Sequence, residues 1–267
     1  MLANYHTHTT FCDGKNTPEE VVKKAISEGF ESLGFSSHGY TEYDLRYCAK
    51  DVVGYIKEIV RLKEAYKEKI EIYLGIEEDS RHINNRADFD YIIGSCHYVT
   101  SPDGTPSPLD SNYDYFKKAL SFFNGDGLLL AEQYYSHFTD YINKRKPDII
   151  GHFDLVTKFE EKGEPLFLHN EEYWKIAEKY TKAALKSGSF FEVNTGLMSR
   201  GYRTSPCPHE RLLRIIFKNG GNIVLSSDSH AADTLSAYFE ETKAHLRDIG
   251  FRYTYVLKGG EWTKNSI

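Results

Sequence analysis

Histidine and carboxylate residues recur where short apolar runs of this sequence end. The first run leads into His6-Thr7-His8 and the last into Asp228-Ser229-His230, so each offers two possible metal ligands at alternate positions. Alternate residues of an extended chain point the same way, so both members of a pair can face one ion. Four further runs end in single residues of the same kind, namely His38, Glu77, His97 and His152.

These donor types indicate catalytic rather than structural metal chemistry. Imidazole and carboxylate ligands without thiolates suit Zn, Mn or Fe rather than a closed structural zinc site. Eight candidate ligands are too many for one tetrahedral ion, so more than one divalent ion is implied. Cations held by a shared carboxylate convert water to hydroxide near neutral pH and clamp phosphate oxygens, which favours hydrolysis of a phosphate ester.

The elements that must position these residues follow from the hydrophobic pattern. Short apolar runs alternate with longer amphipathic ones, which predicts βα units and a mainly parallel sheet. The first helix is expected to begin at Thr17-Pro18-Glu19-Glu20, which has the form of a capping box, and to end at Gly29. The other expected helices are near 51–68, 127–144, 171–186, 208–219 and 233–249. The expected strands are 2–8, 31–37, 70–77, 91–97, 148–152, 189–194 and 221–227.

The loops indicate how these units close. Connections that enter strands are short, whereas those that leave them are long, for example 38–50, the Pro-rich 98–112 and 195–207. In a parallel barrel the loops after the strands form one face, which carries the active site. We therefore expect an α/β fold, a seven-stranded TIM-like barrel in a single domain over residues 1–267. A tail strand near 251–257 is expected to pack on its outside.

Composition excludes several classes of function. The chain has 267 residues and a net charge of −6, so binding of a nucleic-acid duplex by bulk charge is not expected. The first residues lack the features of a signal peptide, and no apolar stretch is long enough to span a bilayer. No membrane association and a cytoplasmic location are therefore expected. Four cysteines without a C-x-x-C pair are expected to be reduced thiols.

As an ordered set, these motifs resemble those of the PHP (polymerase and histidinol phosphatase) family, metal-dependent phosphoesterases on a distorted seven-stranded βα barrel. The strongest likeness is to the histidinol-phosphatase branch. It implies a phosphomonoesterase that hydrolyses L-histidinol phosphate to L-histidinol and inorganic phosphate in histidine biosynthesis. The match rests on His6-x-His8, His38, Glu77 after Gly75, His97, His152 and Asp228-x-His230.

The resemblance also implies how the metals are held at the C-terminal ends of the strands. A second ion would share Glu77 with the first and add His97 and His152. A third would use His38, His230 and the residue soon after the H-x-H motif, which is Asp13 here and histidine in some family members. Two or three ions are therefore expected, with Asp13 as an ordinary turn residue before Gly14 the alternative. The ligands implied for the first ion are His6, His8, Glu77 and Asp228.

The neighbouring Glu78 competes with Glu77 for the bridging role. A strand places the two side chains on opposite faces, so only one can look into the site, and Glu77 is the one that matches the motif. The expected mechanism is direct attack by a metal-bridging hydroxide, with Asp228, Glu77 and His230 as the catalytic residues. Asp228 or a histidine would supply the proton that an alkoxide leaving group needs.

Substrate contacts are expected from the loops that follow the strands. Arg200 and Arg203 are candidates for phosphate binding, because a guanidinium group can donate to two phosphate oxygens. The alternative is that they are solvent-exposed charges on the loop without a binding role. Lys158 and Arg46 are further candidates, and Asn194 with the loop after it marks substrate space. Three carboxylates could meet the ammonium and imidazole of histidinol, and the sequence does not decide among Glu42, Asp44 and Glu160.

Three other functions compete with this interpretation. One is a PHP phosphoesterase that acts on nucleotides or oligonucleotides. Another is an amidohydrolase-type deaminase, which also opens with H-x-H but usually adds a lysine bridge, whereas this chain offers Glu77. The third is a metal-binding protein without catalysis. The sequence indicates a small phosphorylated substrate as the partner and says nothing about the oligomeric state or the native metal.

Overall fold

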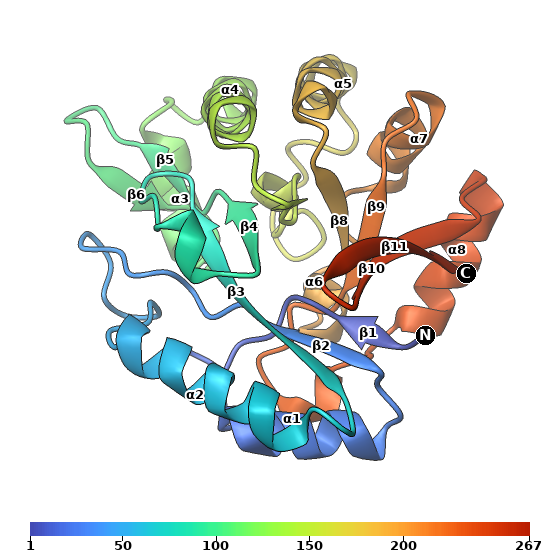
Figure 1. The fold of residues 1–267 in the computed structure, drawn as a ribbon. Coiled ribbons are helices and arrows are strands. Elements are labelled where there is room, and N and C mark those ends of the chain that lie inside the picture. Colours follow the sequence, from blue (N-terminus) through green and yellow to red (C-terminus); the bar gives the residue numbers. More distant parts are fainter.

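Seven parallel strands form one sheet that curls into a barrel with helices around it (Figure 1). The computed structural model describes the whole chain, residues 1–267. The strand order is β1-β2-β3-β4-β7-β8-β9, and every neighbouring pair is parallel. This confirms the predicted α/β barrel. The strands are Ala3–Asn4 (β1), Ser32–Phe35 (β2), Glu71–Asp79 (β3), Tyr91–Ser95 (β4), Ile149–Ile150 (β7), Phe190–Asn194 (β8) and Ile223–Ser226 (β9).

The barrel closes at a single bridge rather than along a ladder between β1 and β9. Thr7 and Ser229 form this parallel bridge just beyond the two strands. The His8 backbone N–H donates to the Ser229 carbonyl at 2.8 Å, and the Ser229 N–H donates to the His6 carbonyl at 3.0 Å. The seam of the barrel therefore joins the H-x-H motif to the D-x-H motif.

Amphipathic helices follow most strands and bury their apolar faces against the sheet. The first helix begins as predicted: the Thr17 hydroxyl accepts a hydrogen bond from the Glu20 N–H, and the Glu20 carboxylate accepts one from the Thr17 N–H at 2.8 Å. None of the helices combines the length and the apolar character needed to cross a bilayer. The helices are Pro18–Ser27 (α1), Val52–Tyr66 (α2), Tyr113–Ser121 (α3), Gly127–Arg145 (α4), Glu171–Ala184 (α5), Gly196–Ser199 (α6), Glu210–Lys218 (α7) and Phe239–Ile249 (α8).

Two of the long loops that leave the strands carry structure that the sequence did not predict. The segment after β4 forms an antiparallel hairpin, Tyr98–Thr100 (β5) with Pro106–Pro108 (β6), and then continues into α3. The segment after β8 contains the short helix α6. Both lie on the side of the barrel where the strands end, so they shape the entrance to any site there.

A tyrosine fills the barrel interior below the strand ends. The Tyr91 hydroxyl donates to the carbonyls of Tyr5 at 2.6 Å and Phe35 at 3.1 Å. Its ring lies so close to Gly34 and Gly75 that a Cβ at either position would overlap it. Glycine is required at these two positions because the ring occupies the space of a side chain.

The C-terminal segment is a hairpin, which differs from the predicted single strand on the outside. Tyr253–Lys258 (β10) pairs with Glu261–Ser266 (β11), and the hairpin lies across the end of the barrel where the strands begin (Figure 1). The Tyr5 hydroxyl accepts from the Leu257 N–H at 2.7 Å, and the Trp262 ring packs on Tyr5. The hairpin covers this end because the apolar residues there would otherwise meet water.

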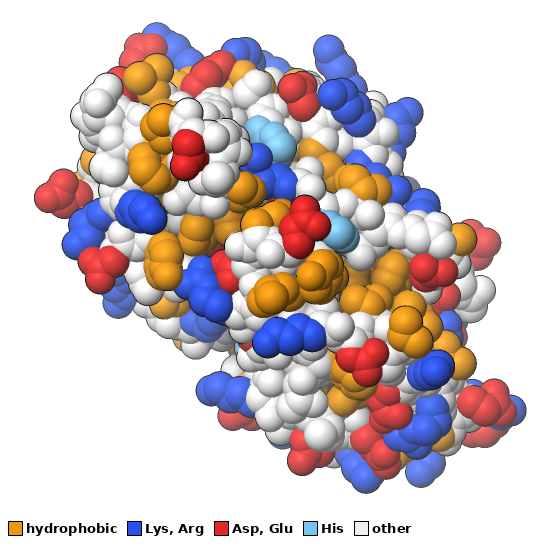
Figure 2. Space-filling model, turned by 90° about the vertical axis from the view of Figure 1, so that its left-hand side faces the viewer, with side chains coloured by type: hydrophobic (Ala, Val, Ile, Leu, Met, Phe, Trp, Pro, Cys, Tyr) orange, Lys and Arg blue, Asp and Glu red, His pale blue; other side chains and the backbone are white.

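The surface carries charge of both signs. On the face in Figure 2, Lys and Arg side chains are interspersed with Asp and Glu, and small apolar clusters lie between them. This face shows no extended area of a single charge.

Candidate active site

Glu77 lies at the centre of the histidines that the sequence singled out. The side chain is 1% exposed and comes from β3, near the end of the strand. Its two oxygens accept or approach imidazole nitrogens from four other strands, because the parallel sheet brings all of these strand ends together. Five nitrogens lie 2.8–3.4 Å from it: His38 Nδ1 and the Nε2 atoms of His6, His8, His97 and His152.

Asp228 faces Glu77 across the two histidines of the first motif. Its Oδ1 lies 3.2 Å from His8 Nε2 and 3.6 Å from His6 Nε2. Its backbone has φ 47°, in the left-handed region that aspartate tolerates better than most residues. This turn directly after β9 aims the carboxylate into the barrel rather than along the loop.

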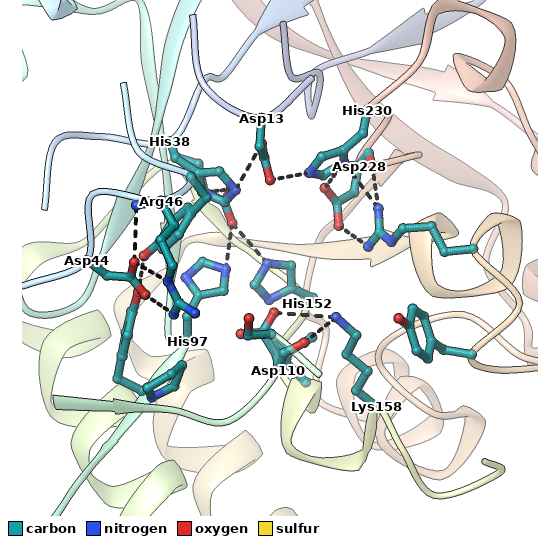
Figure 3. A pocket seen from close by; sticks show the side chains of 18 residues that line it. Asp13, His38, Asp44, Arg46, His97, Asp110, His152, Lys158, Asp228 and His230 are labelled. Atoms are coloured by element: carbon teal, nitrogen blue, oxygen red, sulfur yellow. Dashed lines mark hydrogen bonds and ion pairs between the residues drawn. The ribbon is translucent and has the colours of Figure 1, made fainter. Parts of the chain in front are cut away.

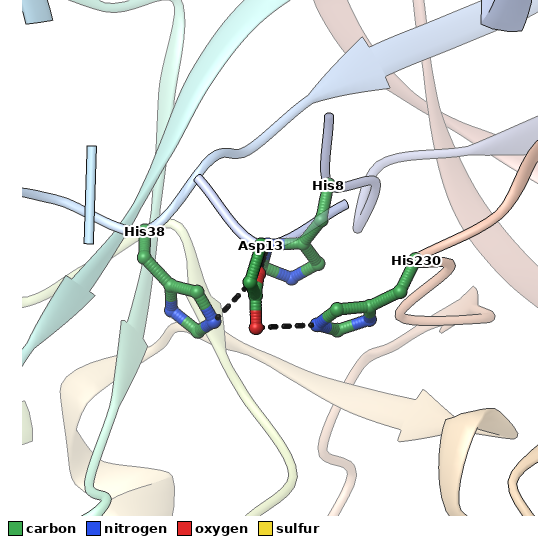
Figure 4. A group of neighbouring side chains, drawn as sticks. All are labelled: His8, Asp13, His38 and His230. Atoms are coloured by element: carbon green, nitrogen blue, oxygen red, sulfur yellow. Dashed lines mark ion pairs between the residues drawn. The ribbon is translucent and has the colours of Figure 1, made fainter. Parts of the chain in front are cut away.

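Asp13 brings a further group of histidines together (Figure 4). Its Oδ2 lies 3.4 Å from His230 Nε2, and its Oδ1 lies 3.8 Å from His38 Nε2. The same oxygen lies 3.8 Å from His8 Nδ1, so this group borders on the one around Glu77. The structure thus places Asp13 beside the two histidines with which the family resemblance grouped it.

The donor atoms fit divalent cations. All nine residues with a predicted metal role fall into four overlapping groups whose donor atoms lie within 4.8 Å of one another. Four buried atoms of these groups have no hydrogen-bond partner: His152 Nδ1 and, close to one another, His6 Nε2, His8 Nε2 and Glu77 Oε2. An unpartnered buried polar atom costs about 1–3 kcal/mol, and a cation between the latter three atoms would satisfy them together. The groups are His6/His8/Asp228, His6/Glu77/His152, His38/Glu77/His97 and His8/Asp13/His38/His230.

The electrostatics keep the carboxylates ionised. Burial raises the pKa of Glu77, but the positive charge available on His38 and His6 outweighs it and holds that pKa well below its usual range. Burial raises the pKa of Asp228 in the same way, and the Arg200 guanidinium outweighs it. Both groups are therefore anionic at neutral pH, which is the form that binds a cation.

His8 is held in the neutral form. Burial, reinforced by the neighbouring His230 and His38, lowers its pKa to about 3. A neutral imidazole has a free lone pair, so His8 is available as a ligand across the physiological range.

A cavity of about 300 Å³ opens over the cluster (Figure 3). Its wall carries three cationic side chains, Arg200, Lys158 and Arg46, and two carboxylates that lie outside the metal cluster, Asp44 and Asp110. A basic wall beside ionised metal ligands is suited to a small anion that also meets a metal. The lining also includes three tyrosines, namely Tyr47, Tyr98 and Tyr202.

Arg200 and Lys158 reach the cavity from the loops after β8 and β7. Arg200 Nη2 donates to Asp228 Oδ2 at 2.8 Å. Lys158 Nζ donates to the backbone carbonyl of Asp110 at 2.5 Å and lies 3.6 Å from its Oδ2. Two of the predicted substrate contacts are thus in place to meet an anion.

Three other predicted substrate contacts do not line the cavity, which corrects the sequence interpretation. Arg203 is 3% exposed, because the turn after α6 directs its side chain away from the cavity and into the protein interior. There Nη1 donates to Thr157 Oγ1 at 2.6 Å. Asn194 is fully buried and donates to Glu192 Oε2 at 2.9 Å. Glu42 is exposed on the loop after β2, outside the cavity lining.

The two adjacent glutamates diverge as the strand geometry requires. The Glu78 carboxylate accepts hydrogen bonds from Arg145 Nε at 2.8 Å and the Tyr141 hydroxyl at 2.6 Å, on the outer side of β3 against α4. It is fully buried and makes no contact with the histidine cluster. Glu77 alone faces the site.

Two carboxylates that contact the ligand histidines on the side away from the metal cluster were not predicted from the sequence. Glu192 Oε1 lies 2.6 Å from His6 Nδ1, and Asp79 Oδ2 lies 3.2 Å from His97 Nδ1. Each had a signal: Glu192 interrupts the apolar run of β8, and Asp79 alternates with Glu77 on β3. Asp110 and Tyr202 had none, because they lie in loops of irregular spacing.

Imidazoles and carboxylates that converge on one cavity at the C-terminal ends of barrel strands define a metal-dependent enzyme of the hydrolase class. The model of the PHP domain family matches residues 4–196, and this chain belongs to the PHP family.

Relatives over nearly the whole chain carry one description. A probable histidinol-phosphatase of Schizosaccharomyces pombe is 28% identical over 97% of this chain and 90% of its own length. The histidinol-phosphatase of Lactococcus lactis is 24% identical over 98% of this chain and 96% of its own length.

Solved structures agree with the fold. A protein from Listeria monocytogenes superposes with a TM-score of 0.76 at 19% identity, covering 90% of this chain and 99% of its own. The histidinol phosphate phosphatase of Lactococcus lactis, solved with zinc, L-histidinol and phosphate, superposes with a TM-score of 0.70 at 22% identity, covering 98% of each chain.

Proposed function

We propose that this chain hydrolyses L-histidinol phosphate to L-histidinol and inorganic phosphate. The observation that carries the proposal is the shared cavity, in which Arg200 and Lys158 stand beside a cluster of ionised carboxylates and imidazoles. Cationic side chains and metal ions both stabilise a phosphomonoester dianion. The relatives described as histidinol-phosphatases match over almost the whole chain and support the substrate.

Divalent ions would be held by the four groups around Glu77 and Asp13. When bound, they would polarise the phosphoryl oxygens and make water a nucleophile at neutral pH. We propose two or three ions, with Zn, Mn or Fe as the metals that suit imidazole and carboxylate donors. Elemental analysis of purified protein measures both their number and their identity.

Arg200 and Asp228 would act on the phosphoryl group as a unit. The guanidinium stays hydrogen-bonded to Asp228 and still has further N–H groups that can donate to phosphate oxygens from the cavity wall. His230 Nδ1 lies 3.6 Å from Asp228 Oδ1, and the ring lines the same cavity. It can therefore hold the proton that the departing alkoxide of L-histidinol must receive.

Asp110 is the group placed to meet the ammonium of the substrate. Its carboxylate oxygens accept no hydrogen bond, and the nearest cation, Lys158 Nζ, is 3.6 Å away. The other carboxylate of the cavity wall, Asp44, is engaged by Arg46 Nε at 2.8 Å and by the Tyr98 hydroxyl at 3.1 Å. A cation that enters the cavity therefore finds in Asp110 a carboxylate that is held only by the looser ion pair with Lys158.

A phosphate-release assay with three substrates tests the proposal. We expect the highest kcat/KM with L-histidinol phosphate, a lower value with nucleoside 5′-monophosphates, and little turnover of a phosphodiester. A preference for a nucleotide or the diester would contradict the substrate assignment. Release of ammonia without phosphate from amine substrates would indicate a deaminase instead. We expect the reaction to take place in the cytosol.

A further inference from the structure

A charged residue lies in the middle of the otherwise apolar strand β8. Glu192 sits between Phe191 and Val193, and its side chain is fully buried. A carboxylate in such a place is costly unless hydrogen bonds replace its hydration. The proposed reaction does not use Glu192, because it does not line the cavity.

The contacts of Glu192 saturate both of its oxygens. Oε1 lies 2.6 Å from His6 Nδ1 and accepts from the Ser226 hydroxyl at 2.6 Å. Oε2 accepts from the His152 backbone N–H at 2.7 Å and from Asn194 Nδ2 at 2.9 Å. One carboxylate thus ties β8 to the segments that follow β1 and β7, both of which carry candidate ligands.

We propose that Glu192 is a positioning residue that orients His6 and His152 for metal binding. The inference rests on the proposed metal-dependent function and concerns how the chain prepares the site. Glu192 touches neither the cavity nor the space between the donor atoms, so it acts only through the two histidines.

The argument for His6 follows from the two nitrogens of its ring. An imidazole that binds a metal is in the neutral form and carries one N–H, and the hydrogen bond to Glu192 places that N–H on Nδ1. The lone pair is then on Nε2, which is buried without a hydrogen-bond partner and lies 3.2 Å from Glu77 Oε2. Glu192 therefore fixes both the tautomer and the orientation of the His6 ring. Its negative charge also makes Nε2 a stronger electron-pair donor to a metal ion.

The argument for His152 follows from its backbone. Strand β7 pairs with its neighbours over only two residues, and beyond the Gly151 N–H, which donates to the Gly94 carbonyl at 2.9 Å, no sheet hydrogen bond anchors the chain at His152. The hydrogen bond from the His152 N–H to Glu192 supplies this anchor, and the ring then places Nε2 2.9 Å from Glu77 Oε1. Glu192 thus supports one ligand on each side of the central Glu77.

Zinc affinity of the metal-depleted protein, measured by competition with a chromogenic chelator, tests the proposal. We expect Glu192→Gln to weaken binding about 10- to 100-fold, the range found when a group behind a metal ligand is lost. The matched control is Glu78→Gln, which removes a charge from an equally buried carboxylate that faces α4. We expect it to lower the thermal midpoint and leave zinc affinity unchanged.

Outcomes separate this inference from the proposed function. Zinc binding by Glu192→Gln as tight as by wild type would reduce Glu192 to a structural residue and overturn the inference. A wild-type protein that binds no zinc would overturn the proposed function together with the inference.

If Glu192→Gln does not fold, the conservative variant Glu192→Asp and a proton NMR spectrum test the inference instead. Glu192→Asp keeps the charge and shortens the reach, so we expect an intermediate loss of zinc affinity. In the zinc-loaded wild type, the His6 Nδ1 proton should appear far downfield in the proton NMR spectrum and move upfield in Glu192→Asp. Absence of an Nδ1 proton on His6 in the wild type would contradict the inference.

Discussion

The Arg200 guanidinium holds Asp228 at two points. Nη2 donates to the carboxylate Oδ2 and Nη1 to the backbone carbonyl, each at 2.8 Å. Asp228 occupies a left-handed backbone conformation directly after β9, and Arg200 reaches it from the loop after β8. Besides lining the cavity, the arginine therefore fixes the turn that aims a candidate ligand.

Replacement of Arg200 by lysine should separate these roles from simple charge. Lysine keeps the positive charge but cannot form the two-pronged contact. Loss of one charge-assisted hydrogen bond is worth about 1.5–3 kcal/mol, so we expect kcat/KM for phosphate release to fall roughly 10- to 100-fold. Arg211→Lys, on an exposed arginine paired with Glu171, is the control and should change nothing. Equal kinetics of Arg200→Lys and wild type would contradict the two-point role.

Asp110 should bind the ammonium group of the substrate. We expect Asp110→Asn to raise KM for L-histidinol phosphate by about tenfold, because one charge-assisted contact is lost. With p-nitrophenyl phosphate, whose leaving group carries no cation, the same variant should keep the KM of the wild type. Steady-state kinetics with the two substrates gives the comparison directly.

Glu42→Gln is the matched control for this experiment. Glu42 is a carboxylate that the sequence offered for the same role, and the structure places it outside the cavity lining. Its variant should leave both KM values unchanged. A Glu42 effect on L-histidinol phosphate alone, with none for Asp110→Asn, would reverse the assignment.

Arg203 should matter for stability rather than catalysis. Its buried guanidinium lies 3.7 Å from Asp154 Oδ2, and that carboxylate is fully buried as well. Arg203→Met would leave the buried Asp154 carboxylate without its ion-pair partner, so we expect the free energy of unfolding to drop by about 3–5 kcal/mol in urea denaturation. The folded fraction should keep the wild-type KM, and a raised KM with unchanged stability would restore Arg203 as a phosphate contact.

The sequence predicted the barrel and the cluster for one shared reason. Ligand residues at the ends of successive parallel strands must meet, and the position of a residue along a strand is visible in the hydrophobic pattern. Alternation along a strand showed that only one of Glu77 and Glu78 could face the site, and the family motif selected Glu77. The structure brings all nine residues with a predicted metal role into one cluster.

The loops could not be predicted in the same way. Arg200 and Arg203 are three residues apart in one loop, and only the turn after α6 decides that one faces the cavity and the other the protein interior. Asp110 follows the hairpin of β5 and β6, whose existence depends on tertiary packing and not on local pattern. The sequence showed which loop residues are charged but not which way their side chains point.

Asp13 offers the sharpest test of how many ions the site holds. It lies near His8, His38 and His230 but makes no contact with Glu77 or Asp228. Burial raises the pKa of Asp13, but His38 and His230 outweigh it and hold that pKa well below its usual range, so the group is anionic at neutral pH. It is the only carboxylate of its group, and it belongs to no other group.

We therefore expect Asp13→Asn to remove one metal equivalent and leave the others. The neutral amide is a poorer ligand for a divalent ion, and the groups around Glu77 keep all of their donors. Elemental analysis of wild type and variant, purified in parallel with excess metal and then desalted, measures the difference. Unchanged metal content would show that Asp13 holds no ion, and loss of all metal would show that the groups bind as one unit, because His8 and His38 are shared between them.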